Sequence, residues 1–471
     1  MNIVADLHLH SKFSRAVSKN MVTMEMSRQA DRKGIDLLAT GDWFHPAWMS
    51  QLQADFKEWS EGIYVCKEQG ARNKEQDLTK FLLSGEISNI YQQGGQTRRV
   101  HTIICSPSIK SCLKINEKLR KRGCNLSSDG RPIIGLSLIE LSELVFSVDE
   151  KCMMIPAHAW TPWFALYGSK SGFDSIEEAF GKYSDRIFAI ETGLSSDPVM
   201  NWRIKELEKR NILSFSDAHS PAKMGREATV FQTVSSKLQR PNYKQNSNSK
   251  KQNTKFTYGD IYGAIAERFT GKNEGNLEIS HTIEFYPEEG KYHWDGHRKC
   301  KVIHSPEDTR KKGIECSVCG KPLTVGVEFR VDQLADKQLL DLYGLKKKND
   351  NDVVGYFHPS DKTRPHYVMM VPLLEILAEV EGKGVGTKTV KSKYDSLIDK
   401  FESEFKVLLE VEVDELKIFG GERLSKAIDR VRKGDIVIDP GYDGVFGTVK
   451  IWPSDAEVME SKVDGKQMGL F

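Results

Sequence analysis

The 471-residue chain lacks any long apolar run. No window approaches the roughly 18 consecutive apolar residues that a membrane-spanning helix needs. The opening residues, MNIVADLHLH, also lack the apolar core of a secretory signal. We therefore expect neither a membrane span nor a secretory leader, and we place the protein in the cytoplasm.

The chain also lacks a strong charge of one sign and has few cysteines. Its 68 Lys and Arg residues nearly balance its 66 Asp and Glu residues, for a formal net charge of +2, so any nucleic-acid binding must come from local patches. Of eight cysteines, Cys300, Cys316 and Cys319 cluster and the others are scattered. This pattern argues against a disulfide framework and favours a reducing compartment with one thiolate metal site.

Two further absences exclude classes of protein. No G-x-x-x-x-G-K-[ST] phosphate loop occurs, which excludes a helicase of that type, and no internal repeat marks a solenoid. With 39% apolar and 28% charged residues, the composition is that of a globular protein with a substantial core. The length predicts two or three domains.

The first 230 residues alternate short β-rich runs with helix-like segments such as Met24–Lys33 and Asn201–Arg210. Such alternation predicts an α/β fold with a parallel sheet or barrel, and seven units favour an incomplete or distorted barrel. The expected strands are Ile3–His8, Asp36–Thr40, Phe81–Gly85, Val100–Cys105, Cys152–Pro156, Arg186–Ile190 and Ile212–Phe215.

Composition divides the chain into five parts. We expect the barrel at 1–234 and, at 235–255, a basic linker with six Lys or Arg and no acidic residue. This linker is either a solvated tether or a phosphate contact. A small cysteine-bearing module that helps to bind DNA follows at 256–335, then a mainly helical region at 336–460 and a polar tail at 461–471.

Histidines and acidic residues recur at the ends of the expected strands. Apart from His101, which opens its strand, each lies at or near a C-terminal strand end, where barrel enzymes build their active sites. The candidates are His8, His10, Asp42, His45, Glu86, His101, His158, Glu191, Asp217 and His219.

The His8-x-His10 and Asp217-x-His219 pairs are the strongest part of this pattern. Residues two apart on a strand share a face, so each pair directs two side chains to one place. Nitrogen and carboxylate ligands from several strands predict two or three divalent ions, Zn, Mn or Mg, as phosphodiester hydrolysis requires. His101 and His45, taken singly, are equally compatible with structural roles.

A second metal pattern is His297-x-x-Cys300, fifteen residues, then Cys316-x-x-Cys319. This spacing is typical of a zinc ribbon, and it predicts one structural Zn held by one histidine and three cysteines. His293 or His304 could replace His297 as the fourth ligand, and a redox role for Cys316 and Cys319 is the alternative.

The chain ends in Gln467-Met468-Gly469-Leu470-Phe471 after a polar stretch. This ending resembles the short peptide that binds the bacterial DNA sliding clamp, in which the Gln and the terminal Leu-Phe pair fill a pocket. A tail that is disordered or folded back is the alternative.

The motifs His8-Leu9-His10-Ser11, Gly41-Asp42, Gly85-Glu86, Pro156-Ala157-His158 and Ser216-Asp217-Ala218-His219 resemble the motif set of the PHP superfamily. The resemblance implies a distorted (β/α)7 barrel with a trinuclear site. It implies six ligands, with Glu86 as the bridging carboxylate: His8, His10, Glu86, His158, Asp217 and His219. The chain departs from the common Asp-His pair after the second strand, so the roles of Asp42 and His45 stay open.

Longer strings resemble the endonuclease Q family within that superfamily: DLHLHSKFSRAVS, TGDWFHPAW, PAHAWTPWFALY, ETGLSSDP and SDAHSP. This resemblance also favours His297 in the zinc ribbon. It implies a nucleoid-associated repair enzyme that nicks DNA 5′ to deaminated bases, namely hypoxanthine, xanthine and uracil, and at abasic sites.

For that reaction we expect catalytic roles for Asp217, Glu86 and His158. Trp43, Phe44, Trp160 and Trp163 lie next to candidate ligands, and they are either the walls of a pocket for an extruded base or ordinary core and loop aromatics.

Two other functions compete with this one. A small-molecule PHP phosphoesterase, such as a histidinol-phosphate phosphatase, would need neither the zinc ribbon, the basic linker nor the clamp-like tail. A non-catalytic DNA-binding or polymerase-accessory protein should have lost metal ligands, yet nearly the whole set is present.

Overall fold

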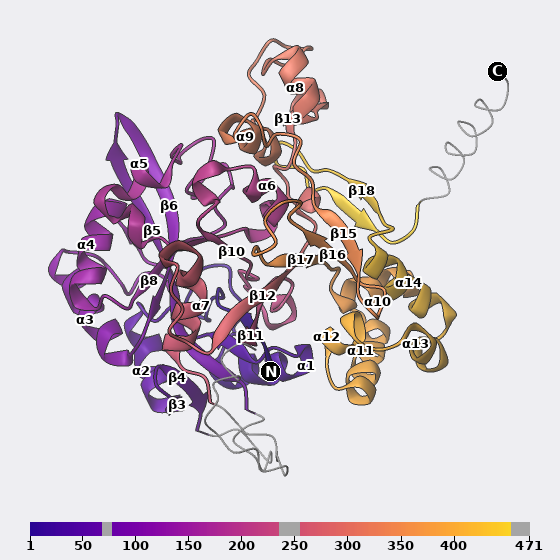
Figure 1. Cartoon of the computed structure of the whole chain (residues 1–471), viewed down its shortest axis with the longest axis horizontal. Coiled ribbons are helices and arrows are strands. Elements are labelled where there is room, and N and C mark those ends of the chain that lie inside the picture. Colours follow the sequence, from indigo (N-terminus) through magenta and orange to yellow (C-terminus); the bar gives the residue numbers. More distant parts are fainter. Residues whose placement is uncertain (68–77, 235–254, 454–471) are drawn as a thin grey trace.

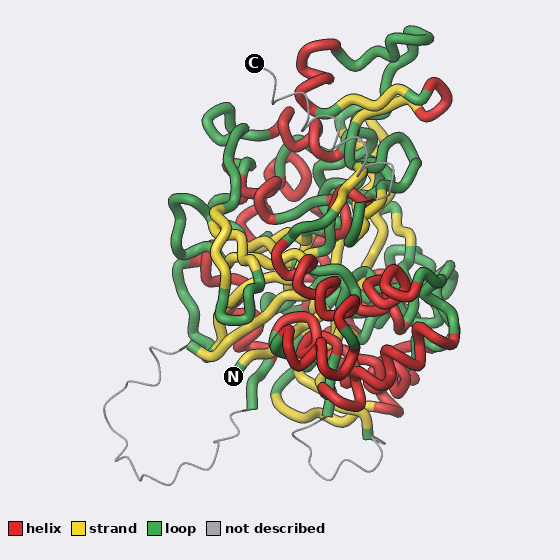
Figure 2. Tube along the Cα trace, turned by 90° about the vertical axis from the view of Figure 1, so that its right-hand side faces the viewer, coloured by secondary structure: helices red, strands yellow, loops and turns green. Residues whose placement is uncertain are grey.

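The computed structural model describes residues 1–67, 78–234 and 255–453. An α/β body holds the N-terminal half, a small lobe with α8, α9 and β13 lies at its top, and a group of helices, α10 to α14, lies at its lower right (Figure 1). Figure 2 shows the same helical group packed beside the strands. No helix in the described ranges is both long and apolar enough to cross a membrane.

Within the described residues a thirteen-stranded mixed sheet organises the body, with the main order β15-β16-β17-β12-β11-β1-β2-β5-β4-β3. Off this path, β6 and β7 pair with β5, and β8 pairs with β6. A separate parallel pair is formed by β9 (Ala189–Glu191) and β10 (Asn211–Leu213). The strands of the large sheet are β1 (Asn2–Asp6), β2 (Leu37–Ala39), β3 (Phe56–Ser60), β4 (Ile63–Cys66), β5 (Lys80–Gln93), β6 (Gln96–Ser106), β7 (Ile133–Ile134), β8 (Met153–Pro156), β11 (Ala228–Thr233), β12 (Leu277–Glu284), β15 (Leu345–Lys348), β16 (Val354–Phe357) and β17 (His366–Met369).

The strands β1, β2 and β5 are parallel, as the sequence predicts, but β5 and β6 form a long antiparallel hairpin. The expectation that Val100–Cys105 follows a helix as another parallel strand is therefore wrong. Gly94 and Gly95 cause the difference, because both have positive φ, 63° and 74°, as a tight two-residue hairpin turn requires. β8 in turn pairs antiparallel with β6.

Helices cover the body and follow local sequence signals. The expected helix Met24–Lys33 is α1 (Thr23–Lys33), which ends at Gly34 with φ of 85°. The expected helix Asn201–Arg210 is instead two short turns, α6 (Pro198–Trp202) and a 3-10 turn (Lys205–Leu207). The other helices of the body are α2 (Pro46–Asp55), α3 (Ile109–Lys121), α4 (Leu138–Val148), α5 (Ile176–Phe180) and α7 (Tyr258–Thr270).

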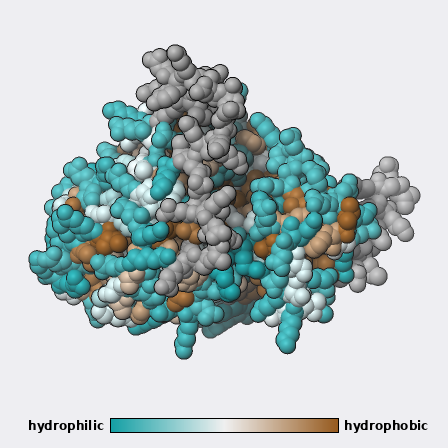
Figure 3. Space-filling view, turned by 90° about the horizontal axis from the view of Figure 1, so that it is seen from below, coloured by the Kyte–Doolittle hydropathy of each residue, from teal (hydrophilic) through white to brown (hydrophobic). Residues whose placement is uncertain are grey.

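Two apolar clusters fill the interior on the two sides of the sheet, and one includes Trp43 and Trp160 while the other includes Phe215 and Tyr258. On the face seen in Figure 3, hydrophilic residues predominate and hydrophobic ones form small patches. The mixed α/β class predicted from the sequence is confirmed.

The C-terminal half has two kinds of structure. The strands β15 to β17 extend the large sheet, whereas residues beyond them form the helical group. The lobe at the top contains β13 (Asp295–His297), β14 (Val302–His304), α8 (Pro306–Lys312) and α9 (Val327–Leu334). The helical group and the hairpin that follows it contain α10 (Leu373–Glu381), α11 (Lys388–Phe401), α12 (Glu404–Leu409), α13 (Val413–Gly420), α14 (Glu422–Lys433), β18 (Val437–Asp439) and β19 (Thr448–Lys450).

A buried ion pair joins the helical group to the body. Lys33 at the end of α1 lies 2.8 Å from a carboxylate oxygen of Glu404, and both side chains are less than 7% exposed. The backbone N–H of Leu373 and the hydroxyl of Tyr394 also donate to Glu404, at 3.0 and 2.9 Å. A buried carboxylate satisfied on both oxygens fixes the position of the group rather than adding much stability.

Candidate metal centre

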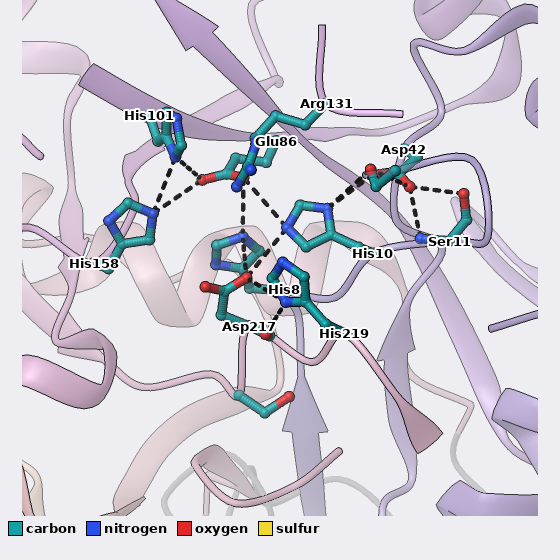
Figure 4. Close-up of polar contacts among 12 residues, drawn as sticks. His8, His10, Ser11, Asp42, Glu86, His101, Arg131, His158, Asp217 and His219 are labelled. Atoms are coloured by element: carbon teal, nitrogen blue, oxygen red, sulfur yellow. Dashed lines mark hydrogen bonds and ion pairs between the residues drawn. The ribbon is translucent and has the colours of Figure 1, made fainter. Parts of the chain in front are cut away.

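Ten side chains predicted from the sequence can now be placed, and most of them converge on one place (Figure 4). His8 and His10 follow β1, whereas Asp217 and His219 follow β10. Leu9 and Ala218, the middle residues of the two motifs, pair in an isolated β-bridge. This pairing brings His8-x-His10 and Asp217-x-His219 side by side.

The first group of potential ligand atoms belongs to His8, His10 and Asp217, whose atoms lie within 4.8 Å of one another. His10 Nε2 is 3.1 Å from Asp217 Oδ1, and His8 Nε2 is 3.7 Å from the same oxygen. Both imidazoles are almost fully buried. Three donors that face one point in a buried place are what a divalent cation requires.

The second group contains Glu86, His101 and His158. Glu86 Oε1 lies 2.8 Å from His101 Nδ1 and 3.1 Å from His158 Nε2. The other oxygen, Oε2, faces the first group and is 3.3 Å from His10 Nε2. In Figure 4 Glu86 accordingly stands between the two groups, which is the position of a bridging carboxylate.

The β5–β6 hairpin explains why His101 lies near the beginning of its strand, whereas the other candidate ligands lie at or near the ends of their expected strands. His101 pairs with Ser88 across the hairpin, and Glu86 pairs with Ile103. Because β6 runs backwards relative to β5, its early residues lie at the same end of the sheet as the later residues of β5. His101 therefore reaches the centre from the beginning of its strand.

Glu191 and Asp42 lie behind the first histidines. Glu191 accepts a hydrogen bond from His8 Nδ1 at 2.9 Å and from the backbone N–H of His158 at 2.7 Å. Asp42 accepts from His10 Nδ1 at 3.0 Å and from the backbone N–H of Ser11 at 2.6 Å. A carboxylate that accepts from Nδ1 fixes the ring so that Nε2 points inward, which is the usual orienting role beside a metal.

His219 lies beside the first ligand group, whereas His45 lies outside both ligand groups. The His219 ring is 4.7 Å from the His10 ring, and its Nδ1 donates to the carbonyl oxygen of Asp217 at 2.8 Å, so Nε2 is left for another partner. His45 caps the start of α2 and stacks on Phe13 with ring centroids 4.5 Å apart. The structure does not bring His45 into either ligand group.

Three residues of the centre have a backbone conformation that non-glycine residues rarely adopt. Asp42, His158 and Asp217 have φ of 43°, 31° and 47°. Each such residue costs on the order of 1–3 kcal/mol and persists only where its surroundings hold it. Close packing does so at His158, since a Cβ on Gly193 would lie 2.4 Å from its Cβ.

The charges of the centre depend on one another. Burial disfavours the Glu86 carboxylate, but His101, Arg131 and His8 outweigh burial and hold its pKa well below the ordinary value. Burial likewise disfavours the charged form of His8, yet Glu191, Asp217 and Glu86 raise its pKa well above the ordinary value. The carboxylates thus stay ionised and attract positive charge.

The donor set fits a metal, and buried polar atoms support this conclusion. His8 Nε2, His10 Nε2 and Asp217 Oδ1 are buried, and among the described residues none of them makes a hydrogen bond of good geometry. Leaving a buried polar atom without a partner costs about 1–3 kcal/mol. Imidazole nitrogens and carboxylate oxygens are the ligands that Zn and Mn accept.

Arg131 is a residue of the centre that sequence reasoning missed. Its Nη1 lies 2.9 Å from Glu86 Oε2, and its side chain is 27% exposed, so the guanidinium reaches both the centre and solvent. It stands in a loop between α3 and β7, outside every strand end. The sequence carries no signal for this role. The neighbouring Gly130 packs closely against the centre, since a Cβ there would lie 2.3 Å from Asp42 Oδ2.

The four aromatic residues proposed for a base pocket have different surroundings. Trp43, Phe44 and Trp160 are fully buried, and the indole N–H groups of the two tryptophans donate to Ile104 O and Asn201 Oδ1. In this structure these three are core residues with no surface for a base. Only Trp163, at 37% exposure, presents its ring to the outside.

The lobe contains a third candidate group, His297, Cys300, Cys316 and Cys319, with all four ligand atoms within 4.8 Å of one another. Burial opposes ionisation of Cys316, but hydrogen bonds from the Val318 backbone and from His297 outweigh it and lower the pKa of that thiol to about 6. A thiolate is the form that binds zinc.

The two alternative histidines of the lobe lie elsewhere. His293 Nε2 is 3.5 Å from Glu328 Oε2, and His304 is buried on β14 outside the cysteine group. The proposed clamp-binding residues Gln467, Leu470 and Phe471, and nearly all of the basic segment 235–255, are outside the described residues.

Known proteins resemble the chain over different parts of its length. The family model described as MJ0043 C-terminal domain matches residues 372–435. The protein MJ0043 of Methanocaldococcus jannaschii is 30% identical over 311 residues, 65% of this chain but only 33% of MJ0043, so the chain spans about a third of that relative. YqxK of Bacillus subtilis is 26% identical over 95% of this chain and 99% of its own length.

Among solved structures, the lesion-specific endonuclease PfuEndoQ of Pyrococcus furiosus has a TM-score of 0.75 at 28% identity, covering 98% of this chain and 99% of its own. A complex of endonuclease Q with a 27-mer duplex carrying an abasic lesion at the active site also has a TM-score of 0.75, at 29% identity, covering 97% of this chain and 98% of its own.

The fold and the centre together define a mixed α/β protein whose large sheet ends in a candidate polynuclear metal centre. Within that class, the protein that the chain resembles is endonuclease Q. The resemblance predicted from the sequence motifs is confirmed over almost its entire length.

Proposed function

We propose that the chain is a metal-dependent DNA endonuclease of the endonuclease Q type, a hydrolase that cuts the phosphodiester on the 5′ side of deaminated bases and abasic sites. The observation that carries the proposal is the pair of ligand groups that share Glu86, in a chain similar to endonuclease Q along 97–98% of its length. The body at 1–234 is then a distorted PHP-type barrel.

The ligand assignment follows from which atoms face the centre. His8, His10, Asp217 and His219 hold metal on one side of Glu86, and His101 and His158 hold it on the other. When bound, two or three divalent ions lower the pKa of water and neutralise the charge of phosphate oxygens, which is the chemistry that phosphodiester hydrolysis needs.

The remaining residues position and balance this chemistry. Glu191 and Asp42 hold the imidazoles of His8 and His10 in one tautomer. Arg131 pairs with Glu86 and is partly exposed, so its guanidinium is placed to bind a phosphate that enters from solvent. The seven metal-facing residues, Glu86 included, determine the chemistry, whereas Glu191, Asp42 and Arg131 position these residues and the substrate.

The cysteine group of the lobe is a structural zinc site. Four protein ligands close the coordination sphere and leave no position for a substrate, so this lobe helps to grip DNA and does not cut it. The rim of the lobe carries Lys299, Lys301, Lys311 and Lys312, and the last two pair with Glu307 and Asp308.

A nicking assay tests the function. Labelled duplexes with a single hypoxanthine, uracil or abasic site should be cut on the 5′ side of the lesion, whereas an undamaged duplex and a small phosphate monoester should not be hydrolysed. Equal cutting of damaged and undamaged DNA would refute lesion specificity. Hydrolysis of the monoester alone would instead favour the small-molecule phosphoesterase.

The terminal pentapeptide supports a second partner, a DNA sliding clamp, and a nucleoid-associated location. Deleting Gln467–Phe471 should abolish capture of the protein by an immobilised bacterial clamp and leave nicking of an abasic duplex unchanged. Capture that survives the deletion would rule out this interaction.

A further inference from the structure

Three segments far apart in the sequence bring aromatic rings together where the lobe meets the body. Trp163, in the loop after β8, lies 5.5 Å from Tyr292 in a T-shaped contact. Phe446, in the β18–β19 hairpin, lies on the other side of Lys291, whose Nζ is 5.5 Å from the Tyr292 ring and 5.8 Å from the Phe446 ring. We call Trp163, Tyr292 and Phe446 the aromatic rim.

The rim is exposed to an extent that core packing does not explain. Phe446 is 68% exposed and Trp163 is 37% exposed. A partner that covers a large apolar ring gains about 25 cal/mol of binding free energy for each Å² of ring surface that it removes from water. A cluster of exposed rings from separate segments is a sign of a binding surface.

The rim is built on a rigid frame. The backbone N–H groups of Gly444 and Gly447 donate to Lys291 O and Glu289 O at 2.8 and 3.0 Å, and that of Trp294 donates to Gly441 O at 2.9 Å. These bonds clamp the β18–β19 hairpin to the segment that carries Tyr292. The rings are therefore held in place before any partner arrives.

The rim is also connected to the candidate metal centre. The Thr161 hydroxyl donates to Trp163 O at 2.9 Å and lies 3.4 Å from His158 Nδ1. Phe164, next to Trp163, has its ring 4.9 Å from that of His101. The loop thus contacts His158 through Thr161 and His101 through Phe164. Trp163, which lies between Thr161 and Phe164 in the sequence, is partly exposed.

Cations flank the rings. Lys291 contacts two of them, and Arg298 lies near the Tyr292 hydroxyl, since a Cβ on Gly444 would be 3.4 Å from Arg298 Nη1 and 3.8 Å from that hydroxyl. Both cations are exposed at this place. Aromatic faces interleaved with Lys and Arg are the composition that binds unpaired nucleic acid, by base stacking and phosphate contact together.

We propose that the aromatic rim stacks one unpaired nucleobase of the substrate, at or beside the cleaved nucleotide, while Lys291 and Arg298 contact its flanking phosphates. The inference rests on the proposed function, because it assumes a DNA substrate at the metal centre. It assigns base contact to Trp163, Tyr292 and Phe446 in place of the buried Trp43, Phe44 and Trp160.

The test compares Phe446→Ala with wild-type protein on duplexes that carry one hypoxanthine and in which an abasic analogue replaces one neighbouring nucleotide at a time on either strand. Only cutting on the 5′ side of the hypoxanthine is scored, because the proposed function makes an abasic site a substrate as well. Loss of a base–aromatic stack should raise KM by about tenfold. At one position, removal of the base should raise the KM of the wild-type protein by a similar factor and should leave the KM of Phe446→Ala unchanged. That coupling identifies the stacked base.

Controls separate stacking from general damage. Phe446→Tyr should retain the wild-type KM, Phe446→Leu should not, and Ile418→Ala, which removes an even more exposed apolar side chain on α13, should have no effect. If Phe446→Ala changes KM equally on every duplex, or on none, the inference is wrong.

Failure of the proposed function is recognisable separately. If the wild-type protein nicks no lesion duplex, the endonuclease proposal fails, and the stacking inference is then decided by fluorescence anisotropy. In that assay Phe446→Ala should weaken binding of duplexes that carry the base by about tenfold and leave binding of the duplex lacking it unchanged. Equal anisotropy titrations for both proteins would refute the rim as well.

Discussion

At the scale of single residues, the centre is organised by which nitrogen of each imidazole is free. His8 and His10 both give Nδ1 to a carboxylate and direct Nε2 toward Asp217 and Glu86. Glu191 and Asp42 are thus distinguished from the residues that they orient, although sequence reasoning placed all of them in one list of ligands.

Glu191→Gln tests this orienting role. Gln keeps the size of Glu191 and can still accept one hydrogen bond, but it removes the charge that holds the His8 tautomer. We expect metal affinity at the centre to fall by about 10- to 100-fold, as is usual when an orienting partner is lost. Isothermal titration calorimetry of the metal-free protein with Mn²⁺ measures this affinity. Glu274→Gln, which removes the charge of an exposed carboxylate, is the matched control. An unchanged affinity would show that Glu191 does not orient His8.

A second residue-scale prediction concerns Glu284, a fully buried carboxyl on β12. Burial, and the charge of Asp197, outweigh hydrogen bonds from Ser214 and Thr282 and raise its pKa to about 8. The folded protein therefore keeps a proton that the unfolded chain releases above pH 4.5. The free energy of unfolding should fall as pH rises from about 4.5 to about 8, by on the order of a few kcal/mol.

Glu284→Gln should reduce this pH dependence, because the amide stays neutral throughout, while other buried carboxyls with raised pKa values, such as Glu227, retain their share. Urea unfolding followed by circular dichroism at pH 5, 6, 7 and 8 gives the slope for both proteins. A variant with the same slope as the wild type would mean that Glu284 is ionised in the folded state.

At the scale of secondary structure, the hairpin β5–β6 determines the shape of the centre. It brings Glu86 and His101 to one end of the sheet on neighbouring antiparallel strands. The sequence contains the cause, Gly94-Gly95 between two β-rich runs, but strand–helix alternation elsewhere outweighed this two-residue signal. The helix expected at Asn201–Arg210 broke for a comparable reason: apolar spacing alone does not show that Ile204 is extended.

Gly95→Ala tests the turn. The position has open space around it, so the substitution meets no atom, but φ of 74° is unfavourable for a residue with a Cβ. We expect a loss of about 1 kcal/mol in the free energy of unfolding, measured by urea denaturation. Gly135→Ala is the control, since it also has open space and no positive φ. Equal stability of the two variants would contradict the turn assignment.

At the scale of the whole molecule, an α/β body carries a small lobe with a candidate metal site and a group of helices (Figure 1). The positions of most strands of the first 230 residues, the main candidate ligands and the His297–Cys319 group were predictable, because strand periodicity and metal-ligand spacing are local properties of the sequence. Arg131, the aromatic rim and the Lys33–Glu404 pair were not, because each depends on segments that only the tertiary fold brings together.

The same distinction applies to the aromatic residues near the centre. Proximity in sequence to His45 and His158 suggested Trp43, Phe44 and Trp160 as the wall of a pocket, yet all three are in the core. A sequence window does not show on which side of a loop a ring lies. Trp163 differs from Trp160 by three positions and lies on the surface.

Metal-dependent nicking of a duplex with one abasic site tests the central claim most directly. Protein stripped of metal at the centre should be inactive and should regain cutting 5′ to the site on titration with Mn²⁺. Asp217→Asn keeps the size of the side chain and removes its negative charge. This variant should cut at least about 100-fold more slowly than the wild type and should unfold at the same temperature. Nicking that survives metal removal, or an Asp217→Asn protein as fast as wild type, would contradict the account.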